Sequence, residues 1–403
     1  MWHRSVRRLL PLLLAAGAAA QSAGPGIFEA HQDVGTVLTP GTAAYDASRQ
    51  AYTLSASGEN MWATADAFQF AWKKASGDIR LEADIAFLGQ GGDPHRKAVL
   101  IVRQSLDADS PYADVAVHGV GLTSLQAREE KGAATHEVQS NLSSPQRVAL
   151  EKRGPYFYMY VAGPGEALHF AGGSMRIPIQ GPFYVGIGVC AHNKDRVEKA
   201  VFSNLRLSVP PTGGLKPFST LETVTVSSTD ARVTLVSPKP IEAPVWLRER
   251  DLLVYRSGGK RFQVPSAGGT PEPATDPAAP APGEERSPDG KYVYFTSAKG
   301  GSMQVWRKLA DGSGEEQVTH DDFSNWYPHL SPDGSRLVVL SAAKDARTPP
   351  RDADVLLRIV ALASGRVTVL ARLRGGRGTI DASSWSPDSK RLAFVSYQMA
   401  AAH

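Results

Sequence analysis

The chain has 403 residues, which is too long for a single hydrophobic core and suggests two domains that each bury a sizeable interior. Its formal net charge of +4 falls to about +1 without the first twenty residues, which hold three arginines and no acidic residue. A basic surface for nucleic acid is therefore not expected. The single cysteine, Cys190, lies in an apolar run and is expected to be a buried, unreactive thiol.

The N-terminus has the pattern of a secretory signal peptide. Three arginines precede an apolar stretch that begins at Leu9 and runs into an alanine-rich tail. We expect residues 1–20 to be a bacterial Sec-type signal cleaved near Ala20, so that the mature protein is periplasmic or secreted. The apolar stretch is shorter than the roughly 20 residues of a membrane helix, and no later stretch is long enough either, so the mature chain is expected to lack a transmembrane segment.

Residues 24–210 show the period-two alternation of many short antiparallel strands. In residues 78–87 the odd positions are apolar and most even positions are polar, which predicts a strand with one buried face. Two alternating segments, 147–150 and 156–161, flank turn residues and predict a hairpin. This pattern predicts a two-sheet sandwich of the jelly-roll kind.

An internal repeat follows a short Pro/Gly-rich linker at residues 211–217. Three copies of Ser-Pro-Asp, each leading into an apolar run, begin at Ser287, Ser331 and Ser386, and a degenerate copy precedes them. The copies are 44 and 55 positions apart, close to the roughly 40 to 50 residues of a four-stranded propeller blade. Residues 218–398 are therefore predicted to be a β-propeller with about four recognisable blades, which makes the whole chain all-β.

The acidic residues of these repeats have a local structural explanation. In Ser-Pro-Asp-Gly, proline presets φ, aspartate accepts backbone N–H bonds and glycine tolerates positive φ. Asp289, Asp333 and Asp388 are thus predicted to be turn residues rather than catalytic ones. Trp326 and Trp385 precede two of these turns and are predicted to pack between blades.

The segment from Ser287 to Gln398 resembles the WD40-like propeller repeats of the TolB family of periplasmic proteins. The N-terminal half resembles bacterial concanavalin A-like, laminin-G-like domains of unknown function. That second resemblance is carried by four short motifs, namely GENMW at 58–62, FQFAW at 68–72, RKA at 96–98 and RQS at 103–105. The first resemblance implies a propeller with a protein partner, and the second implies a sandwich without an assured activity.

The propeller departs from the TolB pattern in size. TolB-like rings usually have six blades, whereas this segment holds about four. A Pro/Ala-rich stretch at 270–285 reads as a linker where further blades would be expected. We therefore expect an incomplete ring. If the ring closes, strands near 221–226 and 233–236 would pair with the final blade.

Catalytic motifs are missing from the sequence. It has no Gly-x-Ser-x-Gly nucleophile elbow. His136 could begin a zincin motif, but Ser140 stands where the second histidine is needed. Glu82 and Asp84 share a strand face as in some glycosidases, but Ala86 takes the third place, and an exposed polar face is the preferred interpretation. We expect a protein that is not an enzyme.

Metal binding has weak candidates. Asp107, Asp109 and Asp114 could supply oxygen ligands for calcium, which laminin-G-like sandwiches often bind, but a solvated turn is the preferred interpretation. No other cofactor is expected. The charged runs at 95–97 and 129–131 are also expected to be solvated.

One group of aromatic, guanidinium and amide side chains is typical of sugar recognition, which uses flat aromatic faces and a few orienting polar groups. We predict a ligand site on the sandwich from seven residues: Trp62, Trp72, Arg96, Arg103, His118, Gln126 and Arg128. The alternative is that both tryptophans are core residues and that the arginines pair with Glu82 or Asp84.

The function expected from these patterns is that of an exported binding or scaffold protein. Its sandwich would hold a glycan-like or peptide ligand, and its propeller would contact another protein. The alternatives are a carbohydrate-active hydrolase that acts through a groove of the sandwich, and a truncated propeller relative that has lost its function.

Overall fold

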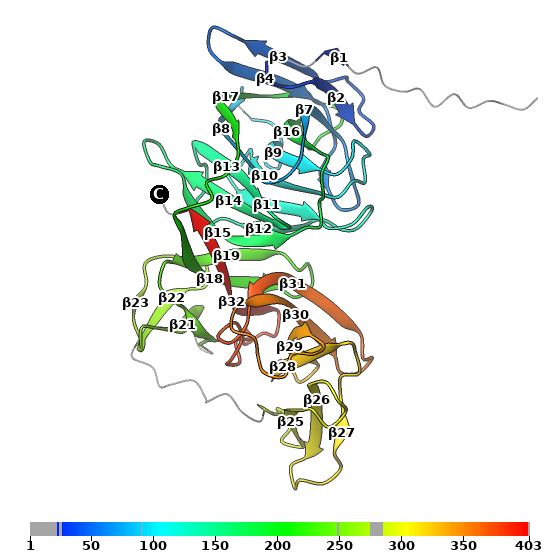
Figure 1. Ribbon diagram of the computed structural model, residues 1–403, viewed down its shortest axis with the longest axis vertical. Helices are drawn as coiled ribbons and strands as arrows, with labels where there is room; N and C mark the ends of the chain where they lie inside the picture. The colour runs from blue at the N-terminus through cyan, green and yellow to red at the C-terminus, as the bar shows by residue number, and fades with distance from the viewer. Residues whose placement is uncertain (1–21, 24–25, 90, 248–249, 275–284, 402–403) are drawn as a thin grey trace, which may run out of the picture.

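The computed structural model describes residues 22–23, 26–89, 91–247, 250–274 and 285–401. In these ranges every regular element is a β-strand, which confirms the predicted all-β class (Figure 1). The predicted signal peptide and residues 275–284 of the predicted Pro/Ala-rich linker lie outside the described residues. The described residues contain no helix that could cross a membrane.

The N-terminal half is a sandwich of two antiparallel sheets (Figure 1). The first sheet has the order β1 (Ser22–Ala23), β2 (Ala30–Val34), β7 (Phe68–Ala75), β16 (Phe183–Cys190), β9 (Lys97–Arg103), β10 (Tyr112–His118), β11 (Thr123–Arg128) and β12 (His136–Gln139). The second sheet has the order β15 (His169–Arg176), β14 (Tyr156–Ala162), β13 (Arg147–Arg153), β8 (Ile79–Leu88), β17 (Glu198–Ser208), β4 (Ala51–Ala56) and β3 (Thr42–Asp46).

The alternation in the sequence places the sandwich core between these sheets. Ile79, Leu81 and Ala83 of β8 face it, as predicted, and they meet residues such as Leu100 and Val115 of the first sheet. The predicted hairpin is also confirmed, because β13 and β14 pair along their length.

The first sheet is covered on its outer face as well. A small hairpin, β5 (Met61–Trp62) and β6 (Ala65–Asp66), lies there. Met61 belongs to a second apolar cluster with Phe68, Ile101 and Tyr112, all of which are fully buried. Strands β9, β10 and β11 are therefore buried on both faces, although their outer positions include charged residues.

The C-terminal half consists of four groups of strands, which we call blades; three are separate four-stranded sheets, and the fourth belongs to the sheet that also contains β12. The first blade is β20 (Glu242–Trp246), β21 (Leu252–Ser257), β22 (Lys260–Pro265) and β23 (Glu272–Pro273); the second is β24 (Glu285–Arg286), β25 (Tyr292–Ser297), β26 (Gln304–Leu309) and β27 (Glu316–Gln317); the third is β28 (Phe323–Leu330), β29 (Arg336–Ala343), β30 (Ala353–Ala361) and β31 (Val367–Gly375). The closing blade is β19 (Ala231–Ser237), β18 (Leu215–Thr225) and β32 (Arg391–Ala401), and Trp385 bridges to Leu392 beside it.

The closing blade joins the two ends of the propeller segment, because β18 pairs with β32 from Leu215 to Thr225. Separate apolar clusters connect the closing blade with the first blade, the closing blade with the third, and the second blade with the third. No apolar cluster of the described residues connects the first and second blades, and Figure 1 shows β25–β27 projecting away from β21–β23. The four blades thus form an open arc, as expected for an incomplete ring.

The two halves share a continuous sheet. Val138 and Gln139 of β12 pair in parallel with Ala231 and Arg232 of β19, so the first sheet of the sandwich continues into the closing blade. Strand β18 begins at Leu215, inside the stretch predicted to be a linker.

Two glycines of β15 allow this strand to lie close to β19 and β12. Gly172 and Gly173 have positive φ, and a Cβ atom on either would lie 2.6 Å from a valine methyl group of β19 or β12. Contacts continue beyond the shared sheet: Arg372 pairs with Glu129 at 2.6 Å.

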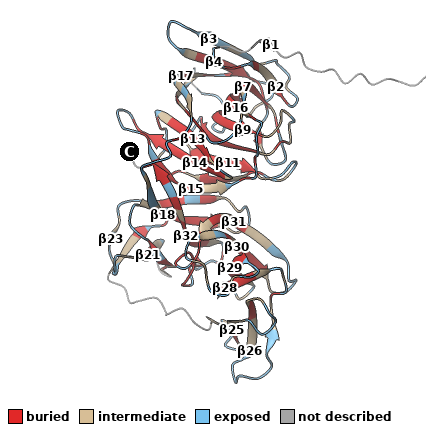
Figure 2. Ribbon diagram, in the orientation of Figure 1, coloured by how far each residue is buried: buried red, intermediate tan, exposed pale blue. Residues whose placement is uncertain are grey.

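An aromatic face of the second sheet completes the junction. Tyr156, Tyr158 and Tyr160 point away from the sandwich core and pack with Phe170, Phe218 and the end of β32. The backbone N–H of Ala401 donates to the Tyr160 hydroxyl at 3.3 Å. Buried residues lie on both sides of the junction as well as within each half (Figure 2).

Candidate functional site: a polar cleft on the sandwich

A cleft of about 270 Å³ lies on the outer face of the first sheet, beside the β5–β6 hairpin. Three residues of the predicted ligand site, Trp62, His118 and Gln126, line it together. The complete lining is Asn60, Trp62, His95, Lys97, His118, Leu122, Gln126, Glu137, Gln139 and His192.

Strand alternation explains why polar side chains gather there. Residues such as Ala98, Val117 and Leu125 face the sandwich core, so their neighbours Lys97, His118 and others face outward. The strand register then aligns them across the sheet: Lys97 lies opposite His118, and Gln126 lies opposite Glu137.

Lys97 forms the floor of the cleft next to Trp62. Its ammonium group donates to the Met61 carbonyl at 2.7 Å and to Asn60 Oδ1 at 3.2 Å, and it lies 5.2 Å from the centre of the Trp62 ring. Burial lowers the pKa of Lys97. The sequence interpretation of residues 95–97 as solvated charge is therefore wrong for Arg96 and Lys97, which are 7 % and 2 % exposed.

Gln126 organises the polar network of the cleft. Its Nε2 lies 3.2 Å from His118 Nε2, 3.1 Å from Ser124 Oγ and 3.3 Å from Glu137 Oε2. The other oxygen of Glu137 accepts a 2.6 Å hydrogen bond from Gln139. Gln126 Oε1 is buried without a hydrogen-bond partner among the described residues.

His118 has a defined protonation state. Burial, followed by repulsion from Lys97, lowers the pKa of His118 to about 3, so the ring is neutral at neutral pH. With Gln126 as donor to Nε2, the ring proton is assigned to Nδ1. In the described part of the chain this buried Nδ1 has no acceptor.

Two further histidines stand at the cleft. The ring of His95 lies 5.9 Å from that of His118 and 5.5 Å from that of His192. Nδ1 of His192 is 3.2 Å from Asp93 Oδ1.

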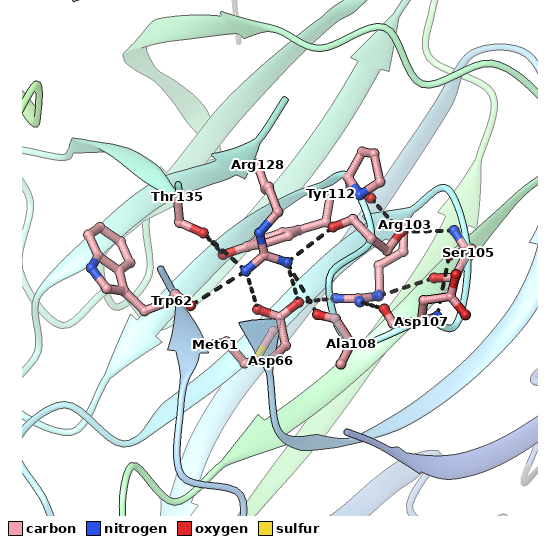
Figure 3. Close-up of polar contacts among 12 residues, drawn as sticks. Met61, Trp62, Asp66, Arg103, Ser105, Asp107, Ala108, Tyr112, Arg128 and Thr135 are labelled. Carbon is pink, nitrogen blue, oxygen red and sulfur yellow. Dashed lines mark hydrogen bonds and ion pairs between the residues drawn. The ribbon is translucent and has the colours of Figure 1, made fainter. Parts of the chain in front are cut away.

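Arg103 and Arg128 lie near the cleft but serve the fold. Both are fully buried on Asp66 of the hairpin, where Arg103 Nη1 is 2.6 Å from Oδ2 and Arg128 Nη2 is 2.8 Å from Oδ1 (Figure 3). Arg103 also donates to the Asp107 carbonyl and Arg128 to the Ser110 carbonyl. These ion pairs hold the β5–β6 hairpin against the first sheet and thereby position Trp62.

The arginines therefore do not use the partners suggested from the sequence. Glu82 is 3.3 Å from Arg80, and Asp84 pairs with Arg147 at 2.6 Å. Neither carboxylate lies in the cleft.

The two remaining members of the predicted site lie outside the cleft. Arg96 pairs with Glu198 at 2.6 Å, and its guanidinium lies 4.4 Å from the Phe87 ring centre. Trp72 is buried in the apolar cluster beneath the hairpin and meets Tyr184 edge to face.

The carboxylates considered for calcium do not come together as a metal site. Lys131 pairs with Asp107 at 2.7 Å and reaches Asp109 at 3.6 Å. Asp114 is fully buried on β10, where both oxygens lack hydrogen-bond partners and burial raises its pKa well above the usual range. Within the described residues no group of three or more acidic, histidine or cysteine side chains is arranged to hold a metal ion.

The acidic residues of the repeats lie in turns. Each accepts a 2.6 Å hydrogen bond from the serine two positions earlier and bonds to a backbone N–H two positions later. These residues are Asp289, Asp333 and Asp388. Trp326 and Trp385 pack in the cluster between the third and closing blades, as predicted.

The sequence interpretation missed seven residues of the cleft: Asn60, His95, Lys97, Leu122, Glu137, Gln139 and His192. Lys97 could have been found from the sequence, because strand alternation places it on the same face as Val99 and Ile101, two apolar residues that are expected to be covered. Asn60 and His192 come from loops whose position depends on tertiary packing.

The chain matches no family model. It is 41% identical over 115 residues to the uncharacterized protein Atu1656 of Agrobacterium fabrum, a match that covers 28% of this chain and 39% of that protein. The chain thus spans well under half of the length of the curated relative it matches.

Several solved structures are similar over parts of the chain. A protein from Agrobacterium tumefaciens provisionally named TolB shows 24% identity and a TM-score of 0.38, over 46% of this chain and 99% of that one. TolB from Acinetobacter baumannii shows 13% identity and a TM-score of 0.22, over 76% and 65%. Carbohydrate-binding module CBM66 from Bacillus subtilis shows 19% identity and a TM-score of 0.29, over 46% and 99%. These scores are too low to carry a functional argument.

Proposed function

We propose that this is an exported binding protein whose cleft holds a sugar ring of a glycan and whose propeller arc contacts another protein. The observation that carries the proposal is the half-buried ring of Trp62 beside two unpartnered buried polar atoms, His118 Nδ1 and Gln126 Oε1.

A sugar ring has the hydroxyl groups and the apolar face that could contact these polar atoms and the Trp62 ring. A sugar hydroxyl both donates and accepts, so adjacent hydroxyls can pair with a ring N–H and an amide oxygen at once. A buried polar atom left without a partner costs roughly 1–3 kcal/mol, and a ligand that supplies the partner recovers that energy. Trp62 offers the flat apolar surface for the other side of the sugar ring.

The size of the cleft limits the ligand. Its volume of about 270 Å³ is just below the roughly 300–1,000 Å³ of typical small-molecule pockets. It therefore suits one sugar ring or the end of a glycan better than a long stretch of polysaccharide. A peptide ligand remains the second candidate for the cleft.

The carboxylates argue for binding rather than hydrolysis. A glycosidase needs two carboxyl groups across the bond to be cleaved. Among the lining residues Glu137 supplies a carboxylate, and both of its oxygens already accept hydrogen bonds from Gln126 and Gln139. Asp114 lies beneath the surface and does not line the cleft.

A glycan array probed with the full chain tests the proposal. We expect a wild-type signal that Trp62→Ala lowers more than tenfold. Trp306→Ala, which truncates another half-buried tryptophan in the second blade, is the matched control and should bind as the wild type does. No signal on any glycan, or an equal loss in both variants, would overturn the proposal.

A further inference from the structure

A second cavity, of about 200 Å³, lies where the two halves meet. Its walls come from β11, β12 and β15 of the sandwich and from β18, β19, β31 and β32 of the propeller. Ten of its eighteen lining residues are apolar, among them Met175, Ile177, Leu370, Leu373 and Phe394, and three of the others are carboxylates, Glu129, Glu137 and Glu222. Apolar cavities of about 150 Å³ can bind benzene, so this one has room for an aromatic ring with a short substituent.

The carboxyl group of Glu222 lines this cavity and is fixed in orientation. Glu222 is buried, with 3 % of its surface exposed. Thr220 donates to Gln398 Oε1 at 3.0 Å, and Gln398 Nε2 donates to Ser396 Oγ at 2.5 Å. The Ser396 hydroxyl must then give its proton to Glu222 Oε1.

The Glu222 carboxyl group accepts the hydrogen bond from Ser396 at Oε1, which leaves Oε2 to face the cavity. The arginines that line the cavity are engaged elsewhere, since Arg372 pairs with Glu129 at 2.6 Å and Arg176 with Asp354 at 3.2 Å. Burial raises the pKa of Glu222 to about 7, so above that pH an ionised carboxylate faces an apolar cavity without a counterion. A buried charge of this kind is costly unless it is paired.

Another polar atom at the cavity is unpaired. The hydroxyl oxygen of Ser174 is buried without a hydrogen-bond partner in the described ranges, and Ser174 lines the same cavity as Glu222. The cavity therefore combines an anionic acceptor, a neutral acceptor and an apolar surface.

We propose that the junction cavity is a binding site for a small apolar molecule with one ammonium group, such as an arylalkylamine. Its N–H groups donate to Glu222 Oε2 and Ser174 Oγ, and its hydrocarbon part packs against Phe394 and Leu373. The proposal does not rest on the glycan proposed for the cleft, although Glu137 lines both cavities.

Calorimetric titration of the full chain at pH 8 with benzylamine and with benzyl alcohol tests the site. The two probes have similar size, but only the amine carries a charge. We expect benzylamine to bind at least tenfold more tightly than benzyl alcohol. Glu222→Gln should remove this preference while leaving the protein folded, because the amide keeps the shape of the side chain and removes a buried charge.

The control is Glu130→Gln, which removes the same charge from an exposed position close to the junction. It should keep the preference for the amine. Equal affinity for both probes, binding of neither, or a preference that survives in a folded Glu222→Gln variant would overturn the proposal. If Glu222→Gln does not fold, the affinities of the wild-type chain for the two probes still test whether the cavity prefers a charged amine.

Discussion

Replacing Asp66 with alanine should be one of the most damaging single substitutions in the sandwich. Asp66 accepts from Arg103 at 2.6 Å and from Arg128 at 2.9 and 2.8 Å, and all three side chains are fully buried. Removing the carboxylate leaves two guanidinium groups buried next to each other without a counterion. It also releases the β5–β6 hairpin that carries Trp62.

The expected loss can be estimated from buried ion pairs. Breaking such a pair from one side typically costs about 3–5 kcal/mol, and here one carboxylate serves two cations, so we expect the upper part of that range. Whole proteins are stable by only about 5–15 kcal/mol. Asp66→Ala should therefore shift the urea midpoint strongly and should weaken ligand binding in the cleft.

Urea unfolding followed by tryptophan fluorescence measures the effect. Asp107→Ala is the matched control, because Asp107 pairs with Lys131 where both side chains are more than half exposed. Such surface pairs contribute about 1 kcal/mol or less. If Asp66→Ala lowers the free energy of unfolding by no more than the control does, the assigned role of the buried triad is wrong.

Three other outcomes follow from the junction and the core. Gly173→Val should lower the free energy of unfolding by about 2–4 kcal/mol, because φ is +69° and the added Cβ would lie 2.6 Å from Val138. The control Gly165→Val also has positive φ but adds its side chain to open space, so it should lower the free energy less in the same urea assay. The raised pKa of Glu222 means that the folded state holds this proton more tightly than the unfolded chain. The free energy of unfolding should thus decrease by an amount on the order of 3 kcal/mol between pH 4.5 and about 7, and Glu222→Gln should remove this slope. Burial raises the pKa of Cys190 to about 11, so iodoacetamide should label it slowly in native protein and rapidly in urea, as read by mass spectrometry.

The local features of this fold could be predicted from the sequence because they depend on neighbouring residues. The Ser-Pro-Asp-Gly turns recur at the spacing of a blade, and the alternation in β8 indicates its buried face. The open arc follows from the small number of repeats. These signals need no knowledge of which segments meet in space.

The ion pairs and the cleft depend on contacts between distant segments. Asp66 is separated by 37 residues from Arg103 and by 62 from Arg128, so nothing local identifies it as their partner. Trp62, His118 and Gln126 were predicted as ligand residues because aromatic and amide side chains stand out in a strand. Lys97 was missed because its neighbours Arg96 and His95 made the run resemble a solvated charge cluster.

The shared sheet predicts that the sandwich does not behave as an independent domain. Strand β12 contributes Glu137 and Gln139 to the cleft, and its other edge pairs with β19 of the closing blade. The sequence carries a sign of this arrangement, because in β14 the tyrosines Tyr156, Tyr158 and Tyr160 alternate with core residues and so provide a second apolar face. A face of this kind must be covered by another part of the chain.

A fragment of residues 26–210 should therefore expose this aromatic face and the free edge of β12, both of which promote association. We expect the fragment to melt at a lower temperature than the full chain and to elute as aggregates in size-exclusion chromatography. Tyr158→Ser in the fragment should reduce aggregation, whereas the same change in the full chain should destabilise the packed junction. A monomeric fragment that melts as high as the full chain would contradict the view that the propeller completes the sandwich.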